Sequence, residues 1–285
     1  MPVLRQAATD DAPACEASAR VDATRYAGAV ARRSSEAVAR EEPLEIQVSG
    51  APLAVVMRTP GHDEELGLGF LVTERVVPGP ADVVSIRHCS LAPSAEAEGN
   101  VIQAVLRPGL AIDLEALRRN LYASSSCGIC GKATLENALA AAPPLRDDAR
   151  FEASFFAGLD SRLRAAQAGF ERTGGLHAAG LFAPDGELLV VREDVGRHNA
   201  VDKVVGWAAR AGRLPLTGHV ILVSGRISYE IVQKALAARV PVVAAVSAPS
   251  SLAVRLAEAA GIALVGFLRG SGLNVYGARE RVLPG

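Results

Sequence analysis

The C-terminal third of the chain alternates short, wholly apolar runs with helical segments. The apolar runs are "HVILV" (219–223), "PVVAAV" (241–246) and "IALVGF" (262–267), and they are separated by "SYEIVQKALAAR" (228–239) and "SLAVRLAEAAG" (251–261). Strands without polar positions are buried on both faces, and strands joined by helices run parallel. This pattern disfavours all-α and all-β folds and predicts an α/β fold whose C-terminal strands are parallel.

The segment before these strands has the patterns of a hairpin and of an amphipathic helix. "AAGLFAPDGELLVVRED" (178–194) places Asp185-Gly186, a typical hairpin turn, between two apolar runs. "NAVDKVVGWAARAG" (199–212) has valines at helical spacing and ends at a glycine. We therefore expect an antiparallel pair and a helix to precede the parallel strands.

Small residues follow all three predicted parallel strands, and an arginine follows the first and the third. These strand ends read "SGR" (224–226), "SAPSS" (247–251) and "FLRGSG" (267–272). Ligands of open α/β sheets bind at the carboxyl ends of the strands, and helix N-termini there favour phosphate. Arg226 and Arg269 would add charge-assisted hydrogen bonds. The alternative is that the small residues only turn the chain and the arginines are solvated.

Two common nucleotide motifs are absent from this part of the sequence. No GxxxxGKS/T motif occurs, and no GxGxxG motif opens a helix after a strand. ATP hydrolysis and dinucleotide-dependent dehydrogenation are therefore disfavoured, whereas a phosphate-bearing ligand remains compatible with the strand ends.

The stretch "REDVGRHNAVDK" (192–203) is denser in polar residues than a solvated turn requires. One interpretation is a helix N-terminus with local salt bridges, and the other is a catalytic role. His177, in "TGGLHAAG", has the same two interpretations, as a structural histidine or as a ligand-binding one. The sequence leaves both alternatives open.

The N-terminal half has weaker patterns. We expect a hairpin around Ser49-Gly50 and a helix after "TPGHDEE" (59–65). Further strands are expected near 83–87 and 101–106, and helices at 113–123 and 132–142 on either side of a Ser/Gly-rich loop. The predicted organisation is a mobile tail at 1–40, an N-terminal region at 41–142, a linker and helix at 143–170, and the C-terminal α/β region at 171–285.

Charge and hydropathy limit the partners of the chain. The formal net charge of -1 provides no global field for nucleic acid or an anionic membrane. No apolar run approaches the roughly 20 residues that span a bilayer, and the N-terminus lacks the apolar stretch of a signal peptide. We therefore expect a cytoplasmic protein, in which thiols stay reduced and a structural disulfide is disfavoured.

Two of the four cysteines, Cys127 and Cys130, form a CxxC motif in "SSSCGICGK" (124–132). A structural zinc site needs four ligands, and the other cysteines are isolated, so no metal site is expected. A zinc deaminase would also need H-x-E and P-C-x-x-C, which are missing. A thioredoxin-like dithiol would follow a strand, but here a helix precedes the loop. A helix N-terminus and Lys132 favour the thiolate, which suits a redox pair or, better, a sulfur carrier.

Several long motifs, in register, resemble those of the FdhD/NarQ family. They are "TPGHDEELGLGFLVTE", "SSSCGICGK", "TGGLHAAGLF", "REDVGRHNAVDKVVG", "VSGRISYEIVQKA", "VPVVAAVSAPSSLAVRLAEAAGI" and "LVGFLRG…NVY". The resemblance extends from about residue 43 to 277, outside the variable stretches 88–100 and 143–170.

The resemblance implies an accessory protein of formate dehydrogenase. Such a protein accepts sulfur from a cysteine desulfurase and transfers it to the molybdenum bis-molybdopterin guanine dinucleotide cofactor, which is bound as a client. It also implies a homodimer and a three-layer α/β/α fold that is cytidine-deaminase-like, with a mixed sheet. Two rival functions remain: a cofactor-binding chaperone without sulfur transfer, and a nucleotide-converting hydrolase of deaminase-like fold.

The resemblance also assigns site residues. It implies that Cys127 bears the persulfide and that Cys130 is its partner. The implied cofactor-binding segment is Phe267, Leu268, Arg269, Gly270, Ser271 and Gly272. Similar sequences carry a second basic residue shortly after "FLRG", where this chain has Ser271-Gly272-Leu273. Anion binding at this segment is therefore expected to depend on Arg269 and on backbone N–H groups.

Overall fold

A mixed six-stranded sheet forms the centre of the C-terminal region. The computed structural model describes residues 17–89, 99–110, 112–115, 117, 138–139 and 142–285. The strands are β8 (His177–Phe182), β9 (Leu188–Asp194), β10 (Val220–Val223), β11 (Val242–Ala245), β12 (Ala263–Arg269) and β13 (Gly272–Gly277), in the order β13-β12-β11-β10-β8-β9. β10, β11 and β12 are parallel, and the other pairs are antiparallel. The predicted parallel strands and the 178–194 hairpin are confirmed.

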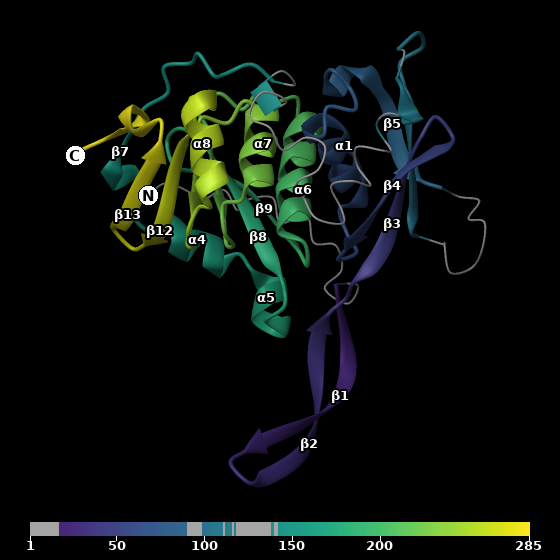
Figure 1. Ribbon diagram of the computed structural model, residues 1–285. Coiled ribbons are helices and arrows are strands. Elements are labelled where there is room, and N and C mark those ends of the chain that lie inside the picture. The colour runs from purple at the N-terminus through teal and green to yellow at the C-terminus, as the bar shows by residue number, and fades with distance from the viewer. Residues whose placement is uncertain (1–16, 90–98, 111, 116, 118–137, 140–141) are drawn as a thin grey trace, which may run out of the picture.

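Helices cover both faces of this sheet, which gives three α/β/α layers (Figure 1). Alternate residues of β10 enter different cores, Ile221 and Val223 on one side and Val220 and Leu222 on the other. The first side is covered by α6 (Arg197–Arg210), α7 (Tyr229–Ala237) and α8 (Ser251–Ala260). The second side is covered by η3 (Ala153–Phe156) and α4 (Leu159–Ala165), which contribute Phe156, Leu159 and Leu163 to the second core. Helix α5 (Ala168–Thr173) follows α4. Burial on both faces explains why these strands lack polar positions.

The helical stretch predicted over 153–170 is broken into three short pieces. Gly158, with φ 78°, separates η3 from α4, and the chain turns again at Gln167 before α5. Glycine adopts this left-handed conformation without the steric cost that a Cβ brings. The break places the N-terminus of α5 beside the sheet edge that carries the three strand ends.

The N-terminal region forms a second, four-stranded sheet in the order β4-β3-β6-β5. Its strands are β3 (Glu42–Val48), β4 (Ala51–Arg58), β5 (Val83–His88) and β6 (Val101–Leu106), which confirms the predicted hairpin at Ser49-Gly50 and both further strands. The predicted helix after "TPGHDEE" is α1 (Asp63–Thr73), with three acidic residues in its first turn. The remaining short elements are η1 (Pro80–Asp82), β7 (Phe151–Glu152), η4 (Arg279–Arg281) and β14 (Val282–Leu283).

Helix α1 joins the two sheets through close helix packing. A Cβ on Gly69 would lie 1.8 Å from the carbonyl oxygen of Asp202, and one on Gly206 would lie 1.8 Å from that of Glu65. On another side of α1, a Cβ on Gly67 would meet Ile102 of β6. The backbones of α1 and α6 are therefore in direct contact, and α1 lies between α6 and the four-stranded sheet.

The mobile tail predicted over 1–40 is wrong for residues 18–39. They form an antiparallel ribbon of β1 (Ser18–Ala27) and β2 (Val30–Ala39), which extends away from the two sheets (Figure 1). Among the strands that the structure describes, these two pair only with each other, and β2 contacts α5 near the base of the ribbon. Residues 1–16 lie outside the described part of the chain. No helix in that part has the length and the hydropathy needed to cross a membrane.

Candidate functional site at the carboxyl edge of the parallel strands

The three strand ends that the sequence singles out lie side by side. Ile227 N donates to Ala248 O (3.2 Å), and Ser250 N donates to Ile227 O (2.9 Å), which joins the first loop to the second. Phe267 N donates to Ser247 O (3.1 Å), which joins the second loop to the third. Backbone hydrogen bonds thus continue across this edge beyond the strands. The predicted convergence of the three loops is confirmed.

The predicted cofactor-binding segment forms the end of β12 and its turn into β13. Phe267 lies at a bulge with φ 55° and is 45% exposed, whereas Leu268 is fully buried in the core. Arg269, Gly270, Ser271 and Gly272 are exposed, and Gly270 has φ 59° at the turn. A ligand at this segment would therefore meet the ring of Phe267, the Arg269 side chain and backbone groups, but not the Leu268 side chain.

Two arginines give this edge positive charge. Arg226 and Arg269 are both exposed, and within the described residues neither forms an ion pair. Helices α7 and α8 begin just beyond the first two loops, at N-cap residues Ser228 and Ser250. Guanidinium groups and helix N-termini attract anions, most strongly when they lie together. The edge is therefore suited to phosphate groups.

A pocket of about 430 Å³ opens between this edge and helices α4 and α5; we call it the edge pocket. It is lined by Asp160, Leu163, Arg164, Gln167, Phe170, Gly174, Gly175, Leu176, His177, Ser224 and Val246. Ser224 and Val246 directly follow β10 and β11. The volume lies in the range of small-molecule sites in proteins.

His177 borders the edge pocket as a neutral histidine. Burial lowers the pKa of His177, the charge of Arg197 lowers it further, and Asp194 acts in the opposite direction. A Cβ on Gly225 would lie 3.2 Å from His177 Nδ1, a tight contact, so the imidazole ring packs closely against the Gly225 backbone. The structure thus places His177 at a candidate ligand site, and the structural and ligand-binding interpretations are compatible.

His198 lies beside the first strand end. Its Nε2 lies 3.2 Å from Ser228 Oγ and 3.8 Å from a carboxylate oxygen of Glu230. Burial lowers the pKa of His198 to about 4, the charges of Lys234 and Arg197 add to this effect, and Glu230 and Glu74 oppose it. The imidazole is therefore neutral near pH 7, so one ring nitrogen donates a hydrogen bond and the other accepts one.

The polar stretch 192–203 does contain the start of a helix with ion pairs, but most of its partners are remote. Arg192 binds the Glu65 carboxylate twice, at 2.6 and 2.9 Å. Lys203 lies 2.7 Å from Asp194 and donates to Thr59 O (2.9 Å). Asp202 accepts from Thr73 (2.6 Å) and pairs with Lys234 at 2.8 Å. The sequence suggested local salt bridges, but the structure has mostly buried ones, and they connect the elements α6, β9, α1 and α7.

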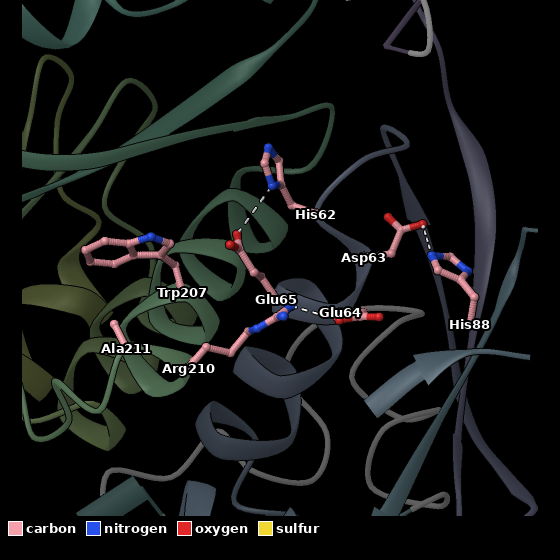
Figure 2. A pocket seen from close by; sticks show the side chains of 8 residues that line it. All are labelled: His62, Asp63, Glu64, Glu65, His88, Trp207, Arg210 and Ala211. Atoms are coloured by element: carbon pink, nitrogen blue, oxygen red, sulfur yellow. Dashed lines mark hydrogen bonds and ion pairs between the residues drawn. The ribbon is translucent and has the colours of Figure 1, made fainter. Parts of the chain in front are cut away.

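A second pocket, of about 520 Å³, lies between the N-terminus of α1 and the C-terminal part of α6 (Figure 2). Its charged groups are already engaged: His62 with Glu65 at 3.7 Å, His88 with Asp63 at 3.5 Å, and Arg210 with Glu64 at 2.9 Å. Across the described ranges, no cluster of three or more His, Cys, Asp or Glu side chains is arranged to hold a metal ion. This pocket is therefore a less suitable site than the carboxyl edge.

Some predicted site residues cannot be located, and some lining residues were not predicted. Cys127 and Cys130 lie outside the described residues. Asp160 and Gln167 belong to the edge pocket, although no sequence motif marks them. Their position depends on the break between α4 and α5, which the helical pattern does not reveal. Gly158 could have indicated the earlier break between η3 and α4, but no comparable sequence signal marks the turn at Gln167 between α4 and α5.

Comparison with known proteins places the chain among relatives of similar length. The profile described as the FdhD/NarQ family matches residues 39–283. The "Sulfur carrier protein FdhD" of Streptomyces avermitilis is 52% identical over 262 residues, which cover 90% of this chain and 92% of the relative. The protein of the same name from Mycobacterium tuberculosis is 51% identical over 253 residues, with 87% and 92% covered.

A solved structure has the same architecture. The crystal structure of a putative formate dehydrogenase accessory protein from Desulfotalea psychrophila superposes with a TM-score of 0.74 at 25% identity. The superposition covers 93% of this chain and 99% of that one. The extent of the profile match and the identity to curated relatives lead to one conclusion: this chain belongs to the FdhD/NarQ family.

Proposed function

We propose that this chain is a sulfurtransferase that acts as a sulfur carrier in the maturation of formate dehydrogenase. The observation that carries the proposal is a family match that spans both cysteines of the CxxC motif and all three loops of the carboxyl edge. The names of the relatives, sulfur carrier protein and formate dehydrogenase accessory protein, support the same role.

The first step is the loading of Cys127. Its thiolate attacks the terminal sulfur of a persulfide on a cysteine desulfurase. The new bond is the S–S bond of the Cys127 persulfide, and the old S–S bond breaks so that the desulfurase cysteine leaves as a thiolate. One sulfur atom moves between two cysteines, and no external oxidant or reductant is required.

The second step is the release of sulfur to the acceptor. The Cys130 thiolate attacks Sγ of Cys127, which forms a Cys127–Cys130 disulfide and expels the terminal sulfur as sulfide. The terminal sulfur is reduced and the two thiols are oxidised, so a dithiol reductant of the thioredoxin class must restore the pair. The sulfide is accepted by the molybdenum bis-molybdopterin guanine dinucleotide, which is cargo of this protein and later a cofactor of formate dehydrogenase.

The acceptor is expected to dock at the carboxyl edge. Phosphates of its dinucleotide tails suit the exposed Arg226 and Arg269, the backbone of residues 267–272, and the nearby helix N-termini. The proposed protein is a cytoplasmic homodimer that binds a cysteine desulfurase and a formate dehydrogenase. The edge geometry supports the docking site, and the partners are proposed from the resemblance to the family.

Sulfur loading is tested by intact-mass spectrometry of the full chain after incubation with a cysteine desulfurase and cysteine. Wild type should gain the mass of one sulfur atom, mapped to the peptide of Cys127, and dithiothreitol should remove it. Cys127→Ala should not load, whereas Cys89→Ala, the matched control, should load as wild type does.

Unchanged loading of Cys127→Ala would overturn the assignment of the carrier residue. If Cys127→Ala does not load but still supports formate dehydrogenase maturation, the chain is instead a cofactor-binding chaperone without sulfur transfer. Neither result depends on the nucleotide-binding properties of the carboxyl edge.

A further inference from the structure

The β1–β2 ribbon has an open strand edge along β2. Among the strands of the described residues, β2 pairs with β1 alone, and the ribbon extends away from the two larger sheets (Figure 1). A two-stranded ribbon is at best marginally stable in water, and an open edge presents N–H and C=O groups that can pair with another strand. A further strand along this edge would stabilise the ribbon.

The backbone groups that point outward along β2 belong to alternate residues. Arg40 N donates to Ala17 O (3.0 Å), so these two residues form a hydrogen-bonded antiparallel pair at the base of the ribbon. Such pairs alternate with pairs that are not hydrogen-bonded. The residues of β2 whose backbone groups point away from β1 are therefore Ala31, Arg33, Ser35 and Ala37. Within the described part of the chain, the only contact to these groups is that of Arg20 Nη1 with Ser35 O at 3.5 Å, which is longer than an ordinary hydrogen bond.

The sequence of β2 is self-complementary about Ser34. In "VARRSSEAV" (30–38), the residues at equal distances from Ser34 are valine and valine, alanine and alanine, arginine and glutamate, and arginine and serine. When two copies of β2 pair antiparallel about a two-fold axis at Ser34, their outward-pointing residues lie opposite one another. Backbone hydrogen bonds can then form along the whole edge. The neighbouring registers with the same alternation place Arg32 opposite Ser34 or Val38 and lose the pairs of opposite charge.

The charges of the ribbon favour this arrangement. Arg25 lies directly opposite Arg32 in the β1–β2 pairing, and like charges in such positions are destabilising. In the two-fold arrangement, Glu36 of the partner subunit lies opposite Arg32 on its other side. Because a two-fold interface repeats every contact, this pair of opposite charges forms twice.

The uncharged side chains of β2 also fit a partner at this edge. Ser34 Oγ is buried and has no hydrogen-bond partner among the described residues. On the two-fold axis it would meet the hydroxyl of Ser34 of the partner subunit, and a hydroxyl both donates and accepts. Val30 and Val38 are 55% and 37% exposed, and in this register each would be covered by the other from the second copy.

Pairing through the outer edge of β1 fits less well. An antiparallel pair centred on Val21 would place Arg20 opposite Asp22 of the partner subunit. However, it would overlap only residues 18–24 of the strand, and it would leave Ser34 Oγ without a partner and Arg32 without an opposite charge. The observations therefore favour the edge of β2.

We infer that the edge of β2 is a dimer interface, at which the ribbons of two copies of this chain form one four-stranded sheet in the order β1-β2-β2-β1, centred on Ser34. The inference rests on the homodimer of the proposed function and deepens it by assigning the surface through which the copies associate. The ribbon lies almost entirely outside the matched family profile, which begins at residue 39.

Analytical ultracentrifugation of the full chain tests the interface. Wild type should sediment as a dimer at micromolar concentrations. Arg32→Glu and Glu36→Arg each place like charges opposite one another at two symmetric positions, so the dissociation constant of the dimer should rise at least about tenfold. The double variant Arg32→Glu/Glu36→Arg restores opposite charges and should recover the dissociation constant of wild type to within about threefold. A monomeric wild type, or single variants that associate as tightly as wild type, would overturn the inference.

Asp22→Arg is the matched control, because it makes the same change of charge as Glu36→Arg but on the other strand of the ribbon. It should remain a dimer. If Asp22→Arg dissociates the dimer and Glu36→Arg does not, the interface is the edge of β1 and the inference is overturned. The ribbon lies outside both hydrophobic cores, so the melting temperatures of all these variants should stay close to that of wild type.

Ser34→Cys tests the register. Opposite residues in a pair that is not hydrogen-bonded have Cβ atoms about 4.5–5.5 Å apart, so a small adjustment permits a disulfide across the two-fold axis. Mild oxidation should give a cross-linked dimer, with the bond mapped to residue 34 by mass spectrometry. Ser35→Cys is the control, because residue 35 lies opposite Arg33 of the partner subunit, and it should cross-link much less. Equal cross-linking of the two variants would overturn the register.

Loading of Cys127 is measured on the same preparations and separates the two proposals. If Cys127 loads but Arg32→Glu and Glu36→Arg leave the dimer intact, only the interface assignment fails. If the dimer responds to these variants but Cys127 does not load, the carrier function fails and the interface stands.

Discussion

His198 illustrates how the environment of one residue changes its chemistry. The sequence shows a histidine in a charged stretch, where an ordinary pKa near 6.5 would be expected. In the fold it lies among Lys234, Arg197, Glu230 and Glu74, and burial is the largest cause that lowers its pKa to about 4. The folded state therefore holds a neutral imidazole at a pH at which the unfolded chain binds a proton.

This difference in proton binding makes stability depend on pH. The pKa of His198 is lower in the folded state than in the unfolded state. Its contribution to the unfolding free energy is therefore fully present above about pH 6.5 and is lost as the pH falls toward about 4. The side chain is 33% exposed, so the expected loss is discounted to about 1–2 kcal/mol. Between pH 7 and pH 4.5, the unfolding free energy of His198→Gln should therefore fall by about 1 kcal/mol less than that of wild type.

Urea denaturation of wild type and variant at both pH values measures this effect. His219→Gln, a histidine near the opposite end of β10, controls for the loss of an imidazole as such. If His198→Gln and wild type lose the same unfolding free energy on acidification, His198 is not the group responsible.

At the level of elements, glycine decides how closely α1 and α6 approach. Gly69 and Gly206 are positions where a Cβ would overlap the backbone of the facing helix. Glycine in a helix costs about 1 kcal/mol relative to alanine, so propensity alone favours replacement of both residues. The observed contact indicates that helix packing outweighs propensity here.

Gly206→Ala should therefore destabilise the protein despite its better helix propensity. A Cβ at 1.8 Å from Glu65 O forces the helices apart, and we expect a loss of at least about 2 kcal/mol of unfolding free energy. Gly79→Ala is the matched control, because a Cβ there meets no atom within 4 Å, and it should change stability by less than about 0.5 kcal/mol. Chemical denaturation measures both variants, and a stabilised Gly206→Ala would contradict the packing argument.

At the level of the whole molecule, buried ion pairs join the N-terminal sheet and α1 to the C-terminal sheet. Arg192 of β9 and Glu65 of α1 are 3% and 8% exposed and are 127 residues apart in the chain. Lys203 of α6, which is ion-paired with Asp194 of β9, also donates a hydrogen bond to the backbone carbonyl of Thr59, just after β4. Since a charge left unpaired in the interior is costly, separation of the two regions would be opposed by each of these contacts.

Arg192→Met should cost about 3–5 kcal/mol of unfolding free energy, because it leaves the Glu65 carboxylate buried without its main partner. His62, whose Nδ1 lies 3.7 Å from that carboxylate, offsets only part of this cost. The double variant Arg192→Met/Glu65→Leu should recover much of the loss, since no charge is then left unpaired.

Differential scanning calorimetry distinguishes the outcomes. Wild type should unfold in one transition, because the buried pairs couple the two regions. Two separate transitions in wild type, or a double variant that is less stable than Arg192→Met, would contradict the coupling.

The sequence predicts best the elements whose residues are buried on one or both faces. The parallel strands β10, β11 and β12, the hairpin β8–β9 and helix α1 all follow from apolar patterns that report burial. The ribbon β1–β2 was missed because its strands bury little: Val21, Tyr26 and Val30 are 41%, 71% and 55% exposed. A strand that is not buried needs no alternation of apolar and polar residues. Backbone hydrogen bonds between strands also require no particular side chains, so the sequence does not indicate such a ribbon.

The sequence by itself determined the α/β architecture and the edge at which the three loops of small residues meet, because local apolar patterns indicate strand direction and burial. Only the tertiary structure decided that Asp160 and Gln167 line a pocket at that edge, that Glu193 accepts hydrogen bonds from the backbone of α5, and that Arg192 is bound to Glu65. These contacts join segments that are far apart in the chain. Hydrophobic periodicity records which face of an element is buried, but not which polar groups meet there.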